Sequence, residues 1–303
     1  VVSQIRACCS LLPTIIFRFS RLADYRRCTS VKHKLTVLMV FGLFAFIFRL
    51  QSRREMNREL TSPVIFDHLK KLFPEIESIP HADTLARLLE HTDPKKIEAI
   101  HLNLIRELIQ KKKFKKLLIQ ECIPVSIDGT QKLTPNEGKK DSETTAFERL
   151  AKRLKAAFPR LKMLFFMDGM FATQSTLGIL HNNRWEYIIR LPRRKLTDLA
   201  KSLNKNKSLK IELPTQLYYR KRKQSFYWEN YITYGYEWQL TIHLVACFEE
   251  YETVNPKTGE IEKRYSEHAW ISSIPARINN LHELLNLGAR KMGLMEDSIN
   301  TEK

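Results

Sequence analysis

Two short apolar segments, each closed by Asp-Gly, constrain the fold of this chain more than any other feature of its sequence. Ile123 to Ile127 runs into Asp128, and Leu161 to Met167 runs into Asp168. Compact apolar runs of this length are typical of strands that are buried on both faces. Residues 142–158, between them, have the spacing of an amphipathic helix. Strand, helix and strand in this order predict an α/β core with both aspartates at the carboxyl ends of their strands, where open α/β sheets place their sites.

The region from about Lys34 to Gln120 has a helical period and is predicted to be all-α. Its most apolar part, Leu35 to Phe48, is fourteen residues long. A run of this length is too short to span a bilayer comfortably, so we expect a buried helix that packs against the other helices of the region. An alternative remains open, in which this run anchors a basic protein to a membrane.

Residues 211–271 are rich in aromatic and β-branched side chains, which favour strands. Asn255 to Gly259 separates two extended segments as a hairpin loop does. These observations predict an inserted antiparallel sheet. From about Asn280 to Lys303 the pattern is helical again.

The chain carries a large positive charge, with 51 Lys and Arg against 33 Asp and Glu, which gives +18. A polyanion releases counterions when cationic side chains neutralise its phosphates, so nucleic acid is the first candidate partner. An anionic membrane surface is the second, and a basic protein without such a partner is the third. The run from Lys111 to Lys116 fits either a phosphate contact or a solvated helix face.

Cysteine and histidine spacing excludes several common kinds of site. The five cysteines form neither CxxC pairs nor an even set, which argues against a zinc site and a disulfide framework and favours a reducing cytoplasm. No His cluster has ligand spacing, and no Ser or Cys has the surroundings of a hydrolase nucleophile. We therefore expect no small-molecule substrate. Residues 1–17 lack a convincing cleavage site, so no signal peptide is expected.

Two aspartates on adjacent strands and a carboxylate on a late helix can together hold two divalent cations. Mg²⁺ prefers oxygen ligands and keeps several waters, so few carboxylates are needed. Two such ions about 4 Å apart activate a water or a 3′-hydroxyl and stabilise the leaving oxygen in phosphoryl transfer. Taken singly, an Asp-Gly after an apolar run is more often only a turn.

Three local motifs resemble those of insertion-sequence DNA transposases of the DDE class, which have a ribonuclease H-like catalytic domain. Residues 125–131 (VSIDGTQ) are similar to the first motif, and residues 165–171 (FFMDGMF), with the strand at 185–192 after them, to the second. Residues 295–303 (MEDSINTEK) resemble the third. The resemblance implies that Asp128, Asp168 and Glu296 are the catalytic residues and the ligands of two Mg²⁺ or Mn²⁺ ions.

The resemblance also implies DNA-binding residues. On a helix Glu296, Asn300 and Lys303 share one face, so Lys303 can reach a transposon-end phosphate while the carboxylate binds metal. Arg290 also matches an arginine of the family's third motif. The early stretch that contains Arg26 and Arg27, and residues 80–89 (PHADTLARLL), are similar to the family's N-terminal region.

The chain also departs from the family pattern. Met292 and Gly293 stand where the family has Arg and often Trp, and Ile299 replaces the usual aromatic residue. Asp128 and Asp168 are only forty residues apart, and residues 131–141 are too short and too polar for two further strands. The sheet of a ribonuclease H-like domain therefore lacks its second and third strands in this chain, and we expect an internal deletion and a C-terminal truncation.

These inferences divide the chain into a basic, DNA-binding helical region at 1–120, an incomplete ribonuclease H-like core at 121–191 and 271–303, and a β-rich insertion at 192–270. The function expected is a DNA transposase that cuts transposon ends and joins them to target DNA, as a homodimer in a synaptic complex in the bacterial cytoplasm. The alternative from a different class is an inactive remnant that only binds DNA. Whether the chain is an active enzyme stays open at this point.

Overall fold

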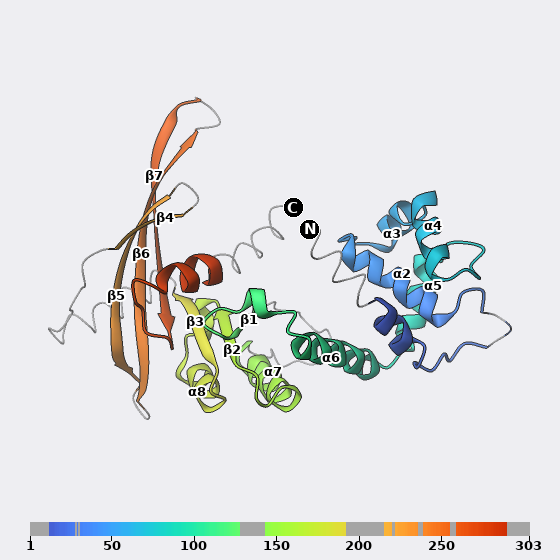
Figure 1. Cartoon of the computed structure of the whole chain (residues 1–303), viewed down its shortest axis with the longest axis horizontal. Coiled ribbons are helices and arrows are strands. Elements are labelled where there is room, and N and C mark those ends of the chain that lie inside the picture. Colours follow the sequence, from blue (N-terminus) through green and yellow to red (C-terminus); the bar gives the residue numbers. More distant parts are fainter. Residues whose placement is uncertain are drawn as a thin grey trace, which may run out of the picture. The chain divides into compact units, whose positions relative to one another are not determined.

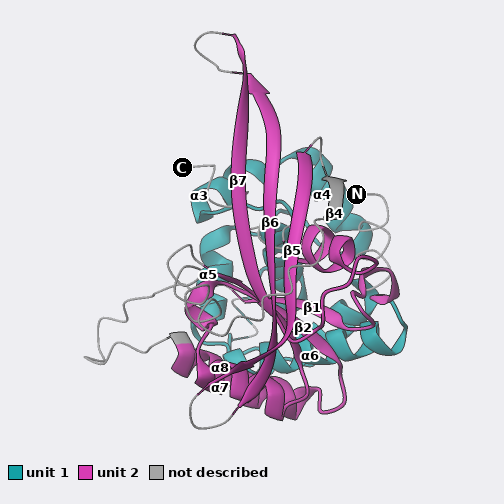
Figure 2. Ribbon diagram, turned by 90° about the vertical axis from the view of Figure 1, so that its left-hand side faces the viewer, with its two compact units in different colours: residues 1–113 teal, residues 114–303 magenta. Residues whose placement is uncertain are grey.

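The structure is a computed structural model that describes residues 12–27, 29, 31–127, 143–191, 215–219, 222–235, 239–254 and 259–289 (Figure 1). The chain forms two compact units, residues 1–113 and 114–303, which Figure 2 distinguishes by colour. The boundary falls a few residues before the end of the helical region expected from the sequence. The short 3-10 helix Lys115–Leu117 and the bridge between Ile119 and Cys122 already belong to unit 2.

The described part of unit 1 is helical. Its helices are residues 12–19, α2 (Leu35–Ile47), α3 (Arg53–Glu59), α4 (Pro63–Leu72), α5 (Ala82–Glu90) and α6 (Pro94–Gln110). Local sequence explains where they begin, because α3 and α4 start after serines whose side chains accept backbone N–H groups, and α6 starts after Asp93, which does the same. Proline at the first position of α4 and α6 has no N–H to leave unpaired.

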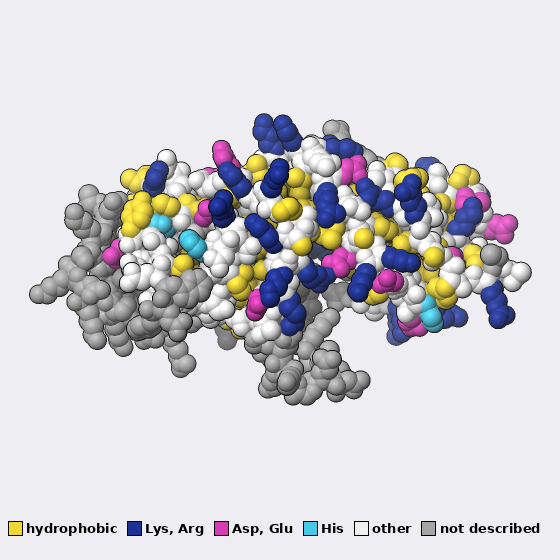
Figure 3. Space-filling view, turned by 90° about the horizontal axis from the view of Figure 1, so that it is seen from below, with side chains coloured by type: hydrophobic (Ala, Val, Ile, Leu, Met, Phe, Trp, Pro, Cys, Tyr) yellow, Lys and Arg dark blue, Asp and Glu magenta, His cyan; other side chains and the backbone are white. Residues whose placement is uncertain are grey.

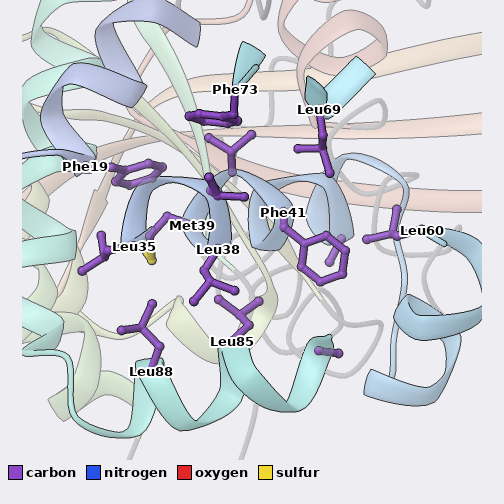
Figure 4. Packing of buried hydrophobic residues seen from close by; sticks show 14 of the residues in the cluster. Phe19, Leu35, Leu38, Met39, Phe41, Leu60, Leu69, Phe73, Leu85 and Leu88 are labelled. Atoms are coloured by element: carbon purple, nitrogen blue, oxygen red, sulfur yellow. The ribbon is translucent and has the colours of Figure 1, made fainter. Parts of the chain in front are cut away.

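Helix α2 is the centre of the core of unit 1. The expectation of a buried helix at 35–48 is confirmed as far as Ala45, whereas Phe46, Ile47 and Phe48 are exposed. Leu38 and Phe41 of α2 are fully buried, and Leu38 points toward Leu85 and Leu88 of α5 (Figure 4). Gly42 allows this close approach, because a Cβ there would lie 2.8 Å from the Leu85 side chain. Among the described helices none is long and apolar enough to cross a membrane.

The described residues of unit 2 form one seven-stranded mixed sheet of order β1-β2-β3-β7-β6-β5-β4. Its strands are β1 (Ile123–Ile127), β2 (Met163–Met167), β3 (Glu186–Leu191), β4 (Thr215–Tyr219), β5 (Arg222–Tyr234), β6 (Leu240–Val254) and β7 (Ile261–Ser272). The first three strands are parallel and the others are antiparallel. The expected α/β class is therefore correct at the level of a mixed α/β fold.

Helices cover both faces of the parallel part of the sheet. On one face lie α7 (Glu143–Ala157) and α8 (Gln174–Asn182), and on the other the π-helix His282–Ala289, drawn in red in Figure 1. Successive side chains of a strand point to opposite faces of the sheet, and β2 shows this. Phe165 contacts Phe147 of α7, whereas Phe166 packs against Gly288 of the π-helix. A Cβ on Gly288 would lie 2.7 Å from the Phe166 ring.

The antiparallel strands share the sheet of the parallel ones. β7 pairs with β3 from Ile188↔Ser272 to Leu191↔Ala269, so the β-rich region expected at 192–270 continues the core sheet at its β3 edge. β6 and β7 extend beyond the other strands as a long hairpin (Figure 2). The hairpin loop expected at 255–259 lies between them, and its residues 255–258 are outside the described residues.

Candidate metal and nucleic-acid site

The strands before the two Asp-Gly pairs are parallel neighbours with their last residues in register. Ile127 at the end of β1 pairs with Met167 at the end of β2. The next residue along each strand is the aspartate singled out by sequence. Asp168 is described, whereas Asp128 lies outside the described residues.

Asp168 is exposed at the carboxyl end of β2 and caps the short 3-10 helix Gly169–Phe171. Its Oδ1 accepts the backbone N–H of Gly169 at 2.6 Å. The cap orients the carboxylate, and two carboxylate oxygens offer about four acceptor positions in all. A cap of this kind needs no metal, but the oriented oxygens are also suitable ligands for Mg²⁺.

Aromatic packing beneath Asp168 makes the end of β2 rigid. Phe171, three residues after it, is 1% exposed and contacts Phe147 of α7 with ring centroids 5.9 Å apart. Phe147 also contacts Phe165 of β2 edge-to-face at 6.0 Å. Asp168 therefore stands on a closely packed aromatic support.

The remaining carboxylate and its neighbours expected from sequence lie outside the described residues. These are Arg290, Glu296, Asn300 and Lys303. The described chain leads toward them through the π-helix, which ends at Ala289 and rests on β2 through Gly288. In the parts of the chain that the structure describes, no group of three or more His, Cys, Asp or Glu residues could hold a metal ion.

Arg26 and Arg27 lie in the loop before α2, in unit 1. The Arg26 guanidinium donates to both carboxylate oxygens of Asp24, at 2.8 and 2.6 Å, and to the His33 carbonyl at 3.0 Å. The hydrogen bond to Arg26 lowers the pKa of Asp24, and the same contact raises the pKa of Arg26. Arg26 thus has a clear role in holding the loop, while Arg27 is exposed.

The stretch PHADTLARLL (80–89) also has a structural role. His81 caps α5 by accepting the Asp83 N–H at Nδ1, and the Ala82 N–H donates to Asn57 at 2.8 Å. The Tyr25 hydroxyl donates to the carbonyl of Arg87 at 2.6 Å. These contacts join the early loop, α3 and α5 into one helical unit.

Sequence reasoning missed a buried polar network in unit 2. Gln224 of β5 and Asn286 of the π-helix exchange two amide hydrogen bonds of 2.9 and 3.0 Å, and both residues are fully buried. Gln224 also donates to Glu249 of β6 at 2.6 Å. The second Glu249 oxygen accepts from Arg222 and from Ser266, at 3.0 Å each. No local motif predicts this network, because strand pairing and the packing of the π-helix bring together residues that are far apart in the sequence.

Comparison with known proteins bears on unit 1. Residues 16–105 match the family model described as DDE_Tnp_1-associated. The match points to a transposase-related function. It covers the helices from α2 to α5, the loop with Arg26 and Arg27, and most of α6, and it stops before the sheet of unit 2. No curated protein shows significant similarity to the chain.

Proposed function

We propose that this chain is a DNA transposase of the DDE class, or derives from one, with Asp128, Asp168 and Glu296 as the ligands of two divalent cations. The observation that carries the proposal is the register of β1 and β2, in which the residues before the two aspartates are direct partners in neighbouring parallel strands. The transposase-associated match at 16–105 supports it independently, because it concerns the other unit of the chain.

In this proposal Mg²⁺ or Mn²⁺ supplies the Lewis acid chemistry of phosphoryl transfer at the ends of the element. Asp168 contributes a carboxylate that the Gly169 N–H orients. The substrates are transposon ends and target DNA, bound in a synaptic homodimer in the bacterial cytoplasm. The net charge of +18 favours a partner of high negative charge density.

A second candidate, an inactive remnant that still binds DNA, is favoured by the surroundings of β1. In the described part of the sheet β1 is the outermost strand on its side. Four of its five residues are partly buried and Ser126 is exposed, whereas every residue of its neighbour β2 is buried. A strand with one neighbour holds a metal ligand less firmly than a strand between two neighbours. We therefore expect DNA binding with little or no cutting and joining.

Mn²⁺ binding by the purified full chain, followed by calorimetry, tests the metal site, and nicking of linear DNA that carries the element's own ends tests the activity. Asp168→Ala should lower Mn²⁺ affinity at least about tenfold, as loss of a metal ligand requires. Asp67→Ala is the control, since Asp67 is an exposed aspartate of unit 1. Equal Mn²⁺ binding by all three proteins would refute the metal site. Specific nicking that Asp168→Ala abolishes would refute the remnant.

A further inference from the structure

Strand β7 has one edge that the described sheet covers only in part. All twelve of its residues pair with β6 in a single register, from Val254↔Ile261 to His243↔Ser272. On its other side β7 pairs with β3 only through residues 269–272. Among the described residues no strand pairs with residues 261–268 on that side, and this stretch is called the β7 edge here.

A hydrogen bond just after β7 shows which backbone groups lie on the β7 edge. The Ser273 N–H donates to the carbonyl of Tyr187 at 3.1 Å, so the backbone of Ser273 faces β3. Along an antiparallel strand, successive residues turn their N–H and C=O groups to alternate sides. The unbroken register of β7 therefore places the backbone groups of Lys263, Tyr265 and Glu267 on the β7 edge, whereas the even-numbered residues between them face β6.

An edge of this length can accept another strand. Its N–H and C=O groups have the spacing of a strand ladder, and proteins commonly protect such edges with charged residues or proline. The β7 edge contains no proline, and its Tyr265 is 73% exposed. It does carry exposed charges, on Lys263 and Arg264. Charges at an edge repel most strands and admit one whose charges are complementary.

A second copy of the same edge is complementary in one register. In a two-fold antiparallel pair centred on Tyr265, each Lys263 lies opposite Glu267 of the other copy, which gives two pairs of opposite charge. Registers centred on Lys263, Arg264 or Glu267 bring two like charges together at the centre. A register centred on Ser266 sets Tyr265 against Glu267 and gains no ion pair there. Because like charges directly opposite each other destabilise a sheet, the charge pattern favours the Tyr265 register.

We propose that two copies of this chain associate through their β7 edges, with the two-fold axis at Tyr265. Tyr265 then exchanges backbone hydrogen bonds with its own copy, and Lys263 does so with Glu267 on either side of the axis. The two exposed Tyr265 side chains come to lie next to each other. This inference rests on the proposed function, which calls for a homodimer, and it names the surface through which the copies meet without DNA or metal.

The contact is small, so the dimer should be weak. Pairing of two short edges buries less than the roughly 1,200 Å² of a stable interface, and a dissociation constant on the order of 10 µM is expected. Lys and Arg side chains are spread over the face of the molecule seen in Figure 3, and the net charge is +18. Two such chains repel each other at low ionic strength, so association should strengthen as salt rises to about 0.15 M.

Sedimentation velocity of the full chain, in about 0.15 M KCl without DNA or divalent cations, measures the association. Lys263→Glu sets two carboxylates against each other at both ends of the contact and should weaken the dimer at least about tenfold. Lys263→Glu/Glu267→Lys restores opposite charges in exchanged order and should return the dissociation constant to within about threefold of the wild-type value.

Two control variants separate the contact between copies from effects within one copy. Glu250→Gln removes the ion pair that Glu250 makes with Lys263 of the same chain at 3.3 Å. Arg277→Glu makes the same change of net charge as Lys263→Glu, at an exposed position outside the sheet. Both control variants should associate as the wild type does.

Amide hydrogen exchange below and above the dissociation constant tests the register. The amides of Lys263, Tyr265 and Glu267 should become protected only as the dimer forms. The amides of residues 262, 264 and 266 face β6 and should be protected at every concentration.

The outcomes separate this inference from the proposed function. A chain that stays monomeric up to about 100 µM, tenfold above the expected constant, overturns the inference. Protection of the Lys263, Tyr265 and Glu267 amides at every concentration also overturns it, because the edge is then covered within one chain. A dimer that Lys263→Glu leaves intact, or that the double variant does not restore, is formed by another surface. A dimer that behaves as expected but binds no Mn²⁺ and nicks no DNA overturns the proposed function alone.

Discussion

The centre of unit 1 and the centre of the antiparallel sheet in unit 2 are stabilised by different physics. Among the described residues of unit 1 the only buried polar side chain is that of His33, and the residues packed around α2 are apolar. Between β5, β6 and the π-helix, Gln224, Glu249 and Asn286 are buried in mutual hydrogen bonds. Apolar contacts depend mainly on volume, whereas a buried polar network depends on each donor meeting an acceptor. The first kind of core should tolerate changes of shape, and the second should not tolerate changes of chemistry.

Phe41→Ala should have the largest effect. Phe41 is fully buried, so its removal leaves a cavity and costs about 3–5 kcal/mol, while Phe41→Leu costs less than about 1.5 kcal/mol. All four tryptophans lie in unit 2, so their fluorescence reports on that unit, and far-UV circular dichroism includes the helices of unit 1. The urea transition by circular dichroism should shift and the fluorescence transition should not. A shift of both by the same amount would mean that the units unfold together.

Glu249→Gln keeps the shape of the side chain but should cost about 2 kcal/mol, because it turns an acceptor into a donor that faces other donors. Its oxygens accept from Gln224, Arg222 and Ser266. The fluorescence transition in urea should move to lower concentration. Glu250→Gln, at the next and more exposed position of β6, is the control and should change little. If Glu249→Gln lowered the free energy of unfolding by less than Phe41→Leu, the buried polar network would not be the more sensitive of the two cores.

The two close-packed glycines sharpen the comparison. Gly288→Ala should cost about 1–3 kcal/mol, since its Cβ would lie 2.7 Å from the buried ring of Phe166. Gly42→Ala should cost less, because its Cβ meets the flexible end of Leu85 and alanine favours the helix by roughly 1 kcal/mol. Thermal unfolding followed by fluorescence for the first variant and by circular dichroism for the second measures both. Equal losses would show that Phe166 can move aside as readily as Leu85.

The smallest effect concerns pH. Burial lowers the pKa of His243 in unit 2, and burial with the nearby Lys32 and Arg26 lowers the pKa of His33 in unit 1. Above a pH of about 6.5 these histidines are neutral in both states, and the free energy of unfolding has its full value. As the pH falls from there through the folded-state pKa, the unfolded chain binds the proton more readily, so the free energy of unfolding decreases. Urea midpoints between pH 7.5 and 5.5 should therefore fall in both units. A His243→Gln chain whose fluorescence midpoint keeps the wild-type pH dependence would contradict this assignment.

Local sequence determined much of the fold and part of the site. The strand Ile123–Ile127 has the predicted bounds, and helix α2 ends one residue before the predicted end. Both follow from nearly unbroken runs of apolar side chains, whose lengths are those of a buried strand and of a buried helix. The parallel pairing of β1 with β2 followed from their order around one helix. Of the expected site residues, only Asp168, Arg26 and Arg27 lie among those described.

Only the tertiary structure decided the joining of the antiparallel strands to the core sheet and the network around Glu249. β7 is next to β3 although about seventy residues of chain separate them, and local periodicity carries no information about such a pairing. Gln224 and Asn286 are 62 residues apart and look like ordinary surface amides in the sequence. Arg26 is an instance of the same limit at short range. The sequence named it as a DNA-binding residue, which stays a prediction, but did not show that its guanidinium donates to both carboxylate oxygens of Asp24. Pairing partners are chosen by the folded chain, because hydrogen bonds depend on distances that composition and spacing do not specify.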